Sequence, residues 1–96
     1  MNVGKLCQFK KFYWLLFPSK DIASVAPHIA TARATEAGAA YYSKRFNCNV
    51  SYISPNSIFC FLEQDGKFMK ILSTNGELGW LVLSDWLIED IEEVNQ

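Results

Sequence analysis

Short apolar runs alternate with turn signals throughout the second half of the chain. Four runs rich in β-branched, aromatic and long aliphatic side chains cover residues 50–54, 58–63, 67–73 and 78–83. Two of the connections between them are Asp65-Gly66 and Asn75-Gly76. These dipeptides favour two-residue hairpins, because a type I′ turn needs a positive φ at both central positions, which Asp, Asn and Gly tolerate. The pattern therefore predicts a meander of short antiparallel strands.

The two ends of the chain are expected to join the same sheet. Residues 3–9 and 12–17 are apolar enough to form strands. After the meander, Ser84 is a suitable N-cap for a single helical turn, and a last short segment lies around residues 90–94. The sequence therefore predicts five or six short strands, with a helical turn before the last one.

An alanine-rich stretch over about residues 21–46 lies between these groups of strands. Its eight alanines favour a helix, but Pro27 and Gly38 interrupt it. Ser24 could cap a helix that holds the proline in its first turn, and Thr35 could open a second helical piece. Gly38 could equally end the first helix. We therefore expect a helical insertion whose limits stay open.

The size and composition indicate one globular domain spanning residues 1–96. Half of the 96 residues are hydrophobic and 20% are charged, which excludes a disordered chain. On folding, a chain of this length buries about 60% or a little more of the surface that it exposes when unfolded, so a core can form without disulfides or metals. The longest uncharged apolar stretches have about six residues, whereas a membrane span needs about 20. Because no signal-peptide pattern is present, we expect a cytoplasmic protein that does not bind membranes.

Charge divides the chain into two halves of opposite sign. Residues 1–48 carry seven Lys or Arg against two acidic residues, giving +5, and residues 49–96 carry two Lys against eight acidic residues, giving −6. One interpretation is mutual neutralisation in the folded domain, and the other is a dipolar surface that steers a charged partner. The pI of about 5.7 and the acidic stretch at 89–93 disfavour nucleic-acid binding.

The residues with catalytic or metal-binding chemistry form no recognised motif. Three cysteines without a Cys-x-x-Cys pair suggest neither a disulfide framework nor a zinc site. Cys48 is the cysteine in a polar setting and His28 is the single histidine, so an enzyme would have to use one of them. The acidic residues at 89–93 are expected to form a solvated face, with no metal and no cofactor. The sequence thus favours a protein that is not an enzyme.

Residues 67–87 resemble the carboxyl-terminal half of bacterial SH3-like domains of the SH3b type. The shared features are a strand, the Asn75-Gly76 hairpin, the Gly79-Trp80 pair that opens the next strand, and a helical turn before the last strand. Similar domains occur in small proteins of bacteria and bacteriophages. The resemblance implies a mainly β (α+β) fold: a small SH3-like barrel of five or six short antiparallel strands that carries the alanine-rich helical insertion.

Closure into a barrel is also favoured on physical grounds, because it removes the open sheet edges through which so apolar a chain would aggregate. Residues 58–62 are apolar throughout, which predicts a strand covered on both faces, with the alanine-rich helix as one cover. The residues expected in the interior are Phe59, Phe61, Met69, Ile71, Leu78, Trp80 and Val82.

The aromatic residues carry the functional prediction. At 15% of the chain they exceed what a small core can bury, and Tyr and Trp combine apolar area with a polar group suited to a contact surface. We expect a protein–protein interaction module, an adaptor or accessory protein of bacterial or phage origin, that binds a protein or peptide partner through exposed aromatics. The residues predicted to form this surface are Tyr13, Tyr41, Tyr42, Tyr52 and Trp86.

Four alternatives stay open. The tryptophans could all be core residues, with the tyrosines at the rim of the core. A nucleic-acid-binding SH3-like protein would use basic residues of the N-terminal half, namely Lys10, Lys11, Lys44 and Arg45. A small enzyme would use Cys48 or His28. A homodimer would set the basic half of one copy against the acidic half of another around an aromatic centre.

Overall fold

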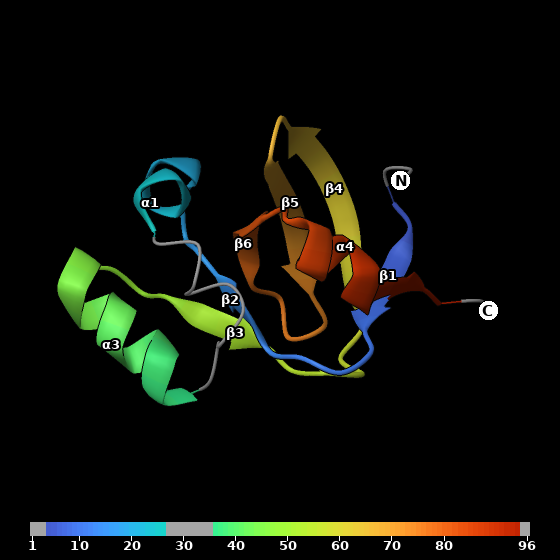
Figure 1. Ribbon diagram of the computed structural model, residues 1–96, viewed down its shortest axis with the longest axis horizontal. Helices are drawn as coiled ribbons and strands as arrows, with labels where there is room; N and C mark the ends of the chain where they lie inside the picture. Colours follow the sequence, from blue (N-terminus) through green and yellow to red (C-terminus); the bar gives the residue numbers. More distant parts are fainter. Residues whose placement is uncertain (1–3, 27–35, 95–96) are drawn as a thin grey trace.

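The computed structural model describes residues 4–26 and 36–94. Seven strands and three short helices form within these ranges, and the strands pair in an antiparallel manner (Figure 1). The strands are β1 (Leu6–Phe9), β2 (Trp14–Leu16), β3 (Ser51–Ile53), β4 (Phe59–Asp65), β5 (Phe68–Ser73), β6 (Leu78–Val82) and β7 (Ile91–Glu93). The helices are α1 (Lys20–Val25), α3 (Glu36–Phe46) and α4 (Asp85–Asp90). The prediction of a mainly β fold is thereby confirmed, but the described residues form seven strands and not the five or six predicted.

The strands form two sheets that a β-bridge connects. The larger sheet has the order β6-β5-β4-β1-β7, and β2 pairs with β3 in the smaller sheet. A bridge between Phe17 and Trp80 connects the end of β2 to β6 through two backbone hydrogen bonds of 2.9 and 2.7 Å. Among residues 4–26 and 36–94, no pairing joins β3 to β7, so the ladder stays open at these two strands. The strand pairing of the described residues therefore does not show the predicted closed barrel.

The hairpin between β4 and β5 lies where it was predicted, but its turn differs from the predicted type I′. Asp65 pairs with Phe68, so the loop residues are Gly66 and Lys67. Gly66 has a φ of +60°, and Lys67 is not among the residues with positive φ. A positive φ at the first loop position alone is the pattern of a type II′ turn, in which glycine is favoured at that position.

The hairpin between β5 and β6 has a three-residue loop. The Ser73 N–H donates to the Glu77 carbonyl at 2.8 Å, which encloses residues 74–76. The Gly76 N–H donates to the Ser73 carbonyl at 3.1 Å, and Gly76 has a φ of +85°. This is a type I turn followed by a left-handed residue, the usual three-residue hairpin loop. The position of the hairpin was predicted correctly, whereas its type I′ turn was wrong.

Strand β2 is buried on both faces and separates two hydrophobic clusters. Trp14 and Leu16 belong to the first cluster, with residues of the five-stranded sheet, and Leu15 and Phe17 belong to the second, with residues of α1 and α3. The prediction that residues 58–62 form the strand covered on both faces is wrong. Strand β4 alternates buried and partly buried residues from Phe59 to Leu62 and is exposed beyond, while α1 packs against β6 and α3 against β3.

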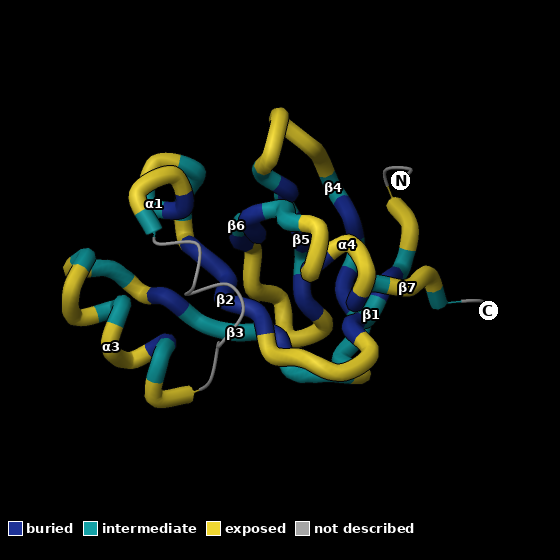
Figure 2. Tube along the Cα trace, viewed as in Figure 1, coloured by how far each residue is buried: buried dark blue, intermediate teal, exposed yellow. Residues whose placement is uncertain are grey.

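The interior is as predicted except at β6. Leu78 is 57% exposed, so the prediction that it lies inside is wrong. It shares one face of β6 with Trp80 and Val82; Val82 belongs to the second hydrophobic cluster and Trp80 packs against it, whereas Leu78 does neither. Burial therefore increases along β6 from its exposed start to its buried end (Figure 2). Trp80 is therefore half-buried. The other expected interior residues are buried: Phe59, Phe61, Met69, Ile71 and Val82.

The alanine-rich insertion contains two helices within the described ranges. Helix α1 begins after Ser19, whose Oγ accepts a backbone hydrogen bond of 3.2 Å, and Ser24 lies inside the helix and does not cap it. Helix α3 runs through Gly38, so that glycine does not end a helix. Pro27 and Thr35 lie outside the described residues. No helix in the part of the chain described is long and apolar enough to cross a membrane.

Candidate functional site

A buried carboxylate holds the segment between β1 and β2 against the end of α4. Asp90 is only 4% exposed, and its carboxylate accepts hydrogen bonds from three N–H groups. The donors are the Lys11 backbone at 2.8 Å, the Phe12 backbone at 3.0 Å and the Trp14 indole at 2.9 Å. The backbone N–H of Lys10 also donates to the Asp90 carbonyl at 2.8 Å. The expected solvated face at 89–93 is therefore wrong for Asp90, because buried acids persist where charge-assisted hydrogen bonds satisfy them.

Helix α4 is a short element with one face in the core and the rest in solvent. Ser84 caps it as predicted, with its Oγ accepting the Leu87 N–H at 3.2 Å. Leu87 and Asp90 lie three residues apart on the same helical face, and both are buried. The remaining residues of the helix are exposed, Trp86 most conspicuously at 65%. The anchoring of Leu87 and Asp90 thus fixes Trp86 at the surface.

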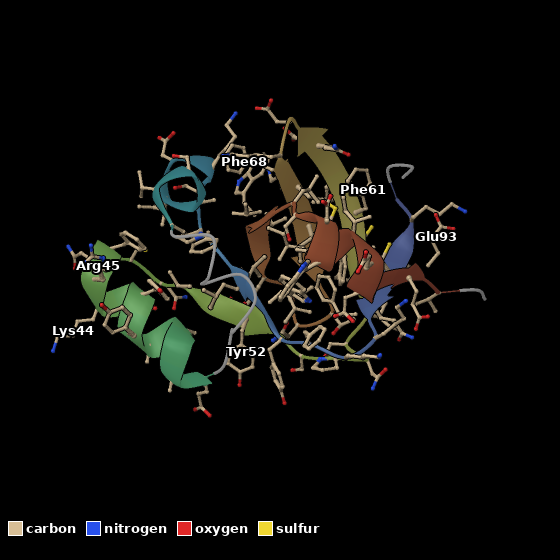
Figure 3. All side chains as sticks on the ribbon, in the orientation of Figure 1. Lys44, Arg45, Tyr52, Phe61, Phe68 and Glu93 are labelled. Atoms are coloured by element: carbon tan, nitrogen blue, oxygen red, sulfur yellow. The ribbon has the colours of Figure 1, made fainter. Side chains whose placement is uncertain are left out.

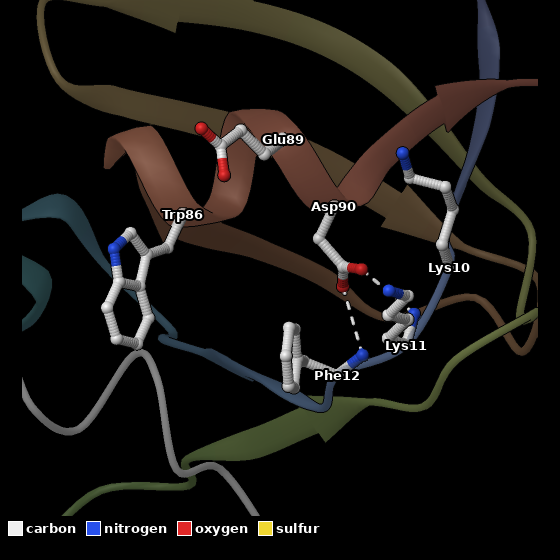
Figure 4. A pocket seen from close by; sticks show the side chains of 6 residues that line it. All are labelled: Lys10, Lys11, Phe12, Trp86, Glu89 and Asp90. Atoms are coloured by element: carbon white, nitrogen blue, oxygen red, sulfur yellow. Dashed lines mark hydrogen bonds between the residues drawn. The ribbon is translucent and has the colours of Figure 1, made fainter.

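A pocket of about 350 Å³ lies between α4 and the segment that Asp90 holds. Its lining residues are Lys10, Lys11, Phe12, Trp86, Glu89 and Asp90. Figure 4 shows Trp86 and Glu89 projecting from α4 on one side, with Phe12 and the two lysines on the other. Phe12 is 48% exposed and meets the buried Trp14 ring edge-on, with centroids 6.4 Å apart. We call this site the Trp86 pocket.

The walls of the Trp86 pocket carry charges of opposite sign. Lys10 and Lys11 lie on one wall and Glu89 on the other (Figure 4). Among the described residues, none of these three side chains has an ion-pair or hydrogen-bond partner, whereas Lys20 and Asp65 pair elsewhere on the surface. The carboxylate of Asp90, in contrast, accepts hydrogen bonds from three neutral N–H groups. The pocket therefore offers two exposed aromatic rings together with available charges of both signs.

The five residues predicted to form one aromatic surface lie in three places. Tyr13 contacts Tyr52 with ring centroids 5.7 Å apart. Tyr41 and Tyr42 lie together on α3 with centroids 4.9 Å apart, and Tyr42 also packs into the second hydrophobic cluster. Of the five residues, Trp86 alone lines the Trp86 pocket. Figure 1 shows α3 at one end of the long axis, away from α4, so the structure does not gather all five into one groove.

Sequence reasoning missed Phe12 and Glu89 as site residues. Residues 12–14 are all aromatic, but the sequence analysis predicts only Tyr13 of this run as a surface residue, because it lies beside polar or turn positions. The signal that points to Phe12 is its spacing from Trp14, because residues two apart in an extended segment share a face, and the two rings are in contact. Glu89 was interpreted as one of several equivalent surface acids. Nothing in the sequence separates it from Asp90, which is buried.

The four basic residues considered for nucleic-acid binding lie in two separate places. Lys10 and Lys11 line the Trp86 pocket. Lys44 and Arg45 lie on the last turn of α3, at the far end of the molecule (Figure 3). The structure does not unite them into a single basic surface of the kind that follows a phosphate backbone.

The cysteines differ in their surroundings. Burial raises the pKa of the Cys7 thiol, and the nearby Glu93 and Cys60 raise it further. Cys48 follows α3, is partly buried, and donates its backbone N–H to the Ser43 carbonyl at 3.0 Å. His28 lies outside the described residues. No group of three His, Cys, Asp or Glu in the described ranges is arranged to hold a metal ion.

Comparisons with known proteins returned nothing similar. No family model matches the sequence, and searches of curated proteins and of solved structures gave no match. Function must therefore be inferred from the chemistry of the site itself.

Proposed function

We propose that this chain is a small non-catalytic protein-binding module, an adaptor or accessory protein, whose partner binds at the Trp86 pocket. The observation that carries the proposal is the exposure of two large aromatic side chains, Trp86 and Phe12, on either side of one pocket. Exposed aromatic rings present apolar area whose burial by a partner is favourable, and tryptophan is among the residues that contribute most to protein–protein binding. A partner side chain placed between the rings would remove both from water.

The construction of the pocket supports binding without a large ordering cost. Three hydrogen bonds to Asp90 hold the backbone of residues 11 and 12 and the ring of Trp14. On the opposite side, Leu87 anchors α4 in the first hydrophobic cluster. Both walls are therefore fixed before a partner arrives, and preorganisation of this kind favours affinity because less conformational entropy is lost on binding.

The order of the strands supports an SH3-like interpretation of the fold. Strands β4, β5 and β6 form a meander, α4 follows as a short helical turn, and β7 returns to pair with β1. The helical insertion lies between β1 and β4. SH3 domains bind extended, often proline-rich segments in grooves lined by aromatic residues. We extend this mode of binding to the Trp86 pocket, with an extended peptide segment as the occupant, in a protein of bacterial or phage origin.

The chemistry of the pocket supports binding rather than catalysis. Nucleophilic catalysis needs a nucleophile within hydrogen-bond reach of a base. Among the residues that the structure describes, the lining has no Ser, Thr, Cys or His, and the Asp90 carboxylate already accepts hydrogen bonds from three N–H groups. The groups that remain available are two ammonium groups, one carboxylate and two aromatic rings, which suit recognition of a peptide side chain.

Selection from a phage-displayed library of random peptides tests this function. We expect the wild-type protein to enrich peptides that carry an aromatic residue or proline. Binding of these peptides, measured by isothermal titration calorimetry, should weaken by at least about tenfold in Trp86→Ala and in Phe12→Ala. Tyr41→Ala is the matched control, because Tyr41 is also an exposed aromatic but lies on α3. Absence of enrichment, or loss of binding in Tyr41→Ala with none in Trp86→Ala, would overturn the proposal.

A further inference from the structure

The charged side chains are distributed unevenly along the Trp86 pocket. Figure 4 shows Trp86 at one end of the pocket and Lys10 and Lys11 at the other. Between these ends, on the side of α4, lie first Glu89 and then Asp90. A ligand that lies along the pocket therefore meets aromatic area at the Trp86 end and positive charge at the lysine end.

The lysine end offers a ligand two ammonium groups. Lys10 and Lys11 are both exposed, and within the described ranges their side chains form no ion pair or hydrogen bond. Their backbone N–H groups are already used, because Lys10 donates to the Asp90 carbonyl and Lys11 to the Asp90 carboxylate, each at 2.8 Å. An anion at this end would thus be bound by two side-chain charges that extend from a backbone already held in place. A lysine ammonium pairs with such an anion as a compact point charge.

The two acidic residues of the pocket leave the lysine end suited to a negative group. Asp90 is 4% exposed, and its carboxylate accepts three N–H groups, so it presents little surface to a ligand. Glu89 is exposed and lies toward Trp86 (Figure 4), where its charge repels a negative group. The pocket therefore favours an anion at one end and disfavours it at the other.

We infer that the peptide segment bound by the Trp86 pocket is acidic. Its apolar side chain lies between Trp86 and Phe12, and an Asp or Glu side chain beside it pairs with Lys10 and Lys11. The inference rests on the proposed protein-binding function of this pocket and adds the charge of the partner. Complementary charges at an interface select between partners and raise the association rate. A basic residue in the same place would meet two like charges and bind more weakly.

Three synthetic peptide pools that differ only in charge test this inference. Every peptide holds one tryptophan among random neutral residues, and the residue beside the tryptophan is Glu, Gln or Lys in the three pools. Binding to the immobilised protein is measured by biolayer interferometry. At about 0.05 M salt the wild-type protein should bind the Glu pool about five- to tenfold more tightly than the Lys pool. The difference should shrink at about 0.5 M salt, because salt screens exposed charges.

Variants of the protein show whether the two lysines cause the preference. Lys10→Gln with Lys11→Gln should bind the Glu and Gln pools equally, whereas Glu89→Gln should keep or increase the preference for the Glu pool. The matched control is Lys44→Gln with Arg45→Gln, which changes the net charge equally but lies on α3 at the far end of the molecule (Figure 3). The control should keep the wild-type preference. All five side chains are exposed, so the urea midpoints should stay close to that of the wild type.

The outcomes separate this inference from the proposed function. A preference for the Glu pool that disappears in the pocket lysine variant and persists in the control supports the inference. Equal binding of the three pools, tightest binding of the Lys pool, or an equal loss of preference in the control overturns it. If binding in those cases still requires Trp86, the proposed function stands without the inference. If no pool binds, the proposed function fails as well.

Discussion

The indole Nε1–H of Trp14 donates a 2.9 Å hydrogen bond to the carboxylate of Asp90, which lies 76 positions later in the chain. Both residues are buried. The contact joins the start of β2 to the junction of α4 and β7, and it places Phe12 opposite Trp86. The geometry of the candidate site therefore depends on a bond between the first and last parts of the fold.

Asp90→Asn should destabilise the protein. The amide retains one acceptor oxygen but turns an NH₂ group toward N–H donors, so at least one buried donor loses its partner. We expect the free energy of unfolding to fall by about 2–4 kcal/mol, measured by urea denaturation. Glu89→Gln is the matched control, because the neighbouring Glu89 is exposed, and it should change stability by less than about 0.5 kcal/mol. Equal effects of the two substitutions would contradict the role given to Asp90.

Gly79→Ala should destabilise the contact between β6 and β2. A Cβ atom at Gly79 would lie 2.4 Å from Cγ of Leu16, which is buried in the first cluster. Overpacking of this kind costs about 1–3 kcal/mol. The control is the same substitution in a Leu16→Ala background, where the space is vacated. Urea denaturation of the four proteins in this cycle should show the cost of Gly79→Ala largely disappearing when Leu16 is truncated, and a cost that is unchanged would refute the steric explanation.

Truncation of Trp14 and of Trp86 should change stability to very different extents. Trp14→Ala removes a fully buried ring and a hydrogen-bond donor, so we expect a loss of about 3–5 kcal/mol in the free energy of unfolding. Trp86→Ala removes a ring that is mostly in solvent and should change stability by less than about 0.5 kcal/mol. Thermal and urea denaturation measure both. A large loss for Trp86→Ala would mean that this residue is structural, as the alternative interpretation of the aromatics holds.

The thiol of Cys7 should react more slowly than those of Cys48 and Cys60. Burial raises the pKa of Cys7 above its ordinary value of 9.0 and shields the sulfur, whereas the other two are partly buried. Mass spectrometry after timed iodoacetamide treatment of the folded protein gives the order of modification. If Cys7 is modified first, its environment is not the one described.

The same pKa shift predicts a dependence of stability on pH. Because the folded state keeps the proton of Cys7 to higher pH than the unfolded state, its contribution is complete below the unfolded pKa and is lost as the pH rises through the folded pKa. The protein should therefore lose stability above about pH 9, and Cys7→Ala should lose less over this range. Urea midpoints measured between pH 7 and about pH 10.5 provide the test. Identical slopes in the two proteins would contradict it.

The local signals in the sequence predicted where strands and helices lie better than they predicted turn types and helix limits. Alternation and the Asp-Gly and Asn-Gly dipeptides located β4, β5 and β6, and Ser84 located the start of α4. Turn type could not be predicted, because the pairing of Asp65 with Phe68 decides which residues enter the loop. The sequence also could not show that α3 continues through Gly38, because the packing of α3 on β3 outweighs the low helix propensity of glycine.

The candidate site could be predicted only in part, because it is assembled from distant segments. The sequence predicts Trp86 as a surface residue from its aromatic ring and its polar neighbours. The partner wall at residues 10–12 comes from the other end of the chain, and the pairing of β1 with β7 and the hydrogen bonds to Asp90 bring it there. In the sequence, Asp90 and Glu89 are neighbouring acidic residues that cannot be told apart, although Asp90 is buried and Glu89 is exposed. An acidic side chain is buried only where hydrogen-bond donors from other parts of the fold satisfy it, and the local sequence does not show where those donors will lie.

The most direct test of the Trp86 pocket is the response of the three tryptophan indole N–H signals in a ¹H–¹⁵N NMR titration. The titrant is the tightest-binding peptide from the selection. We predict that the Trp86 indole signal and the backbone signals of residues 10–12 shift and saturate together, while the buried Trp14 indole keeps its hydrogen bond to Asp90 and shifts little. Shifts confined to Tyr41 and Tyr42 on α3, with the Trp86 indole unchanged, would contradict the assignment of the binding site.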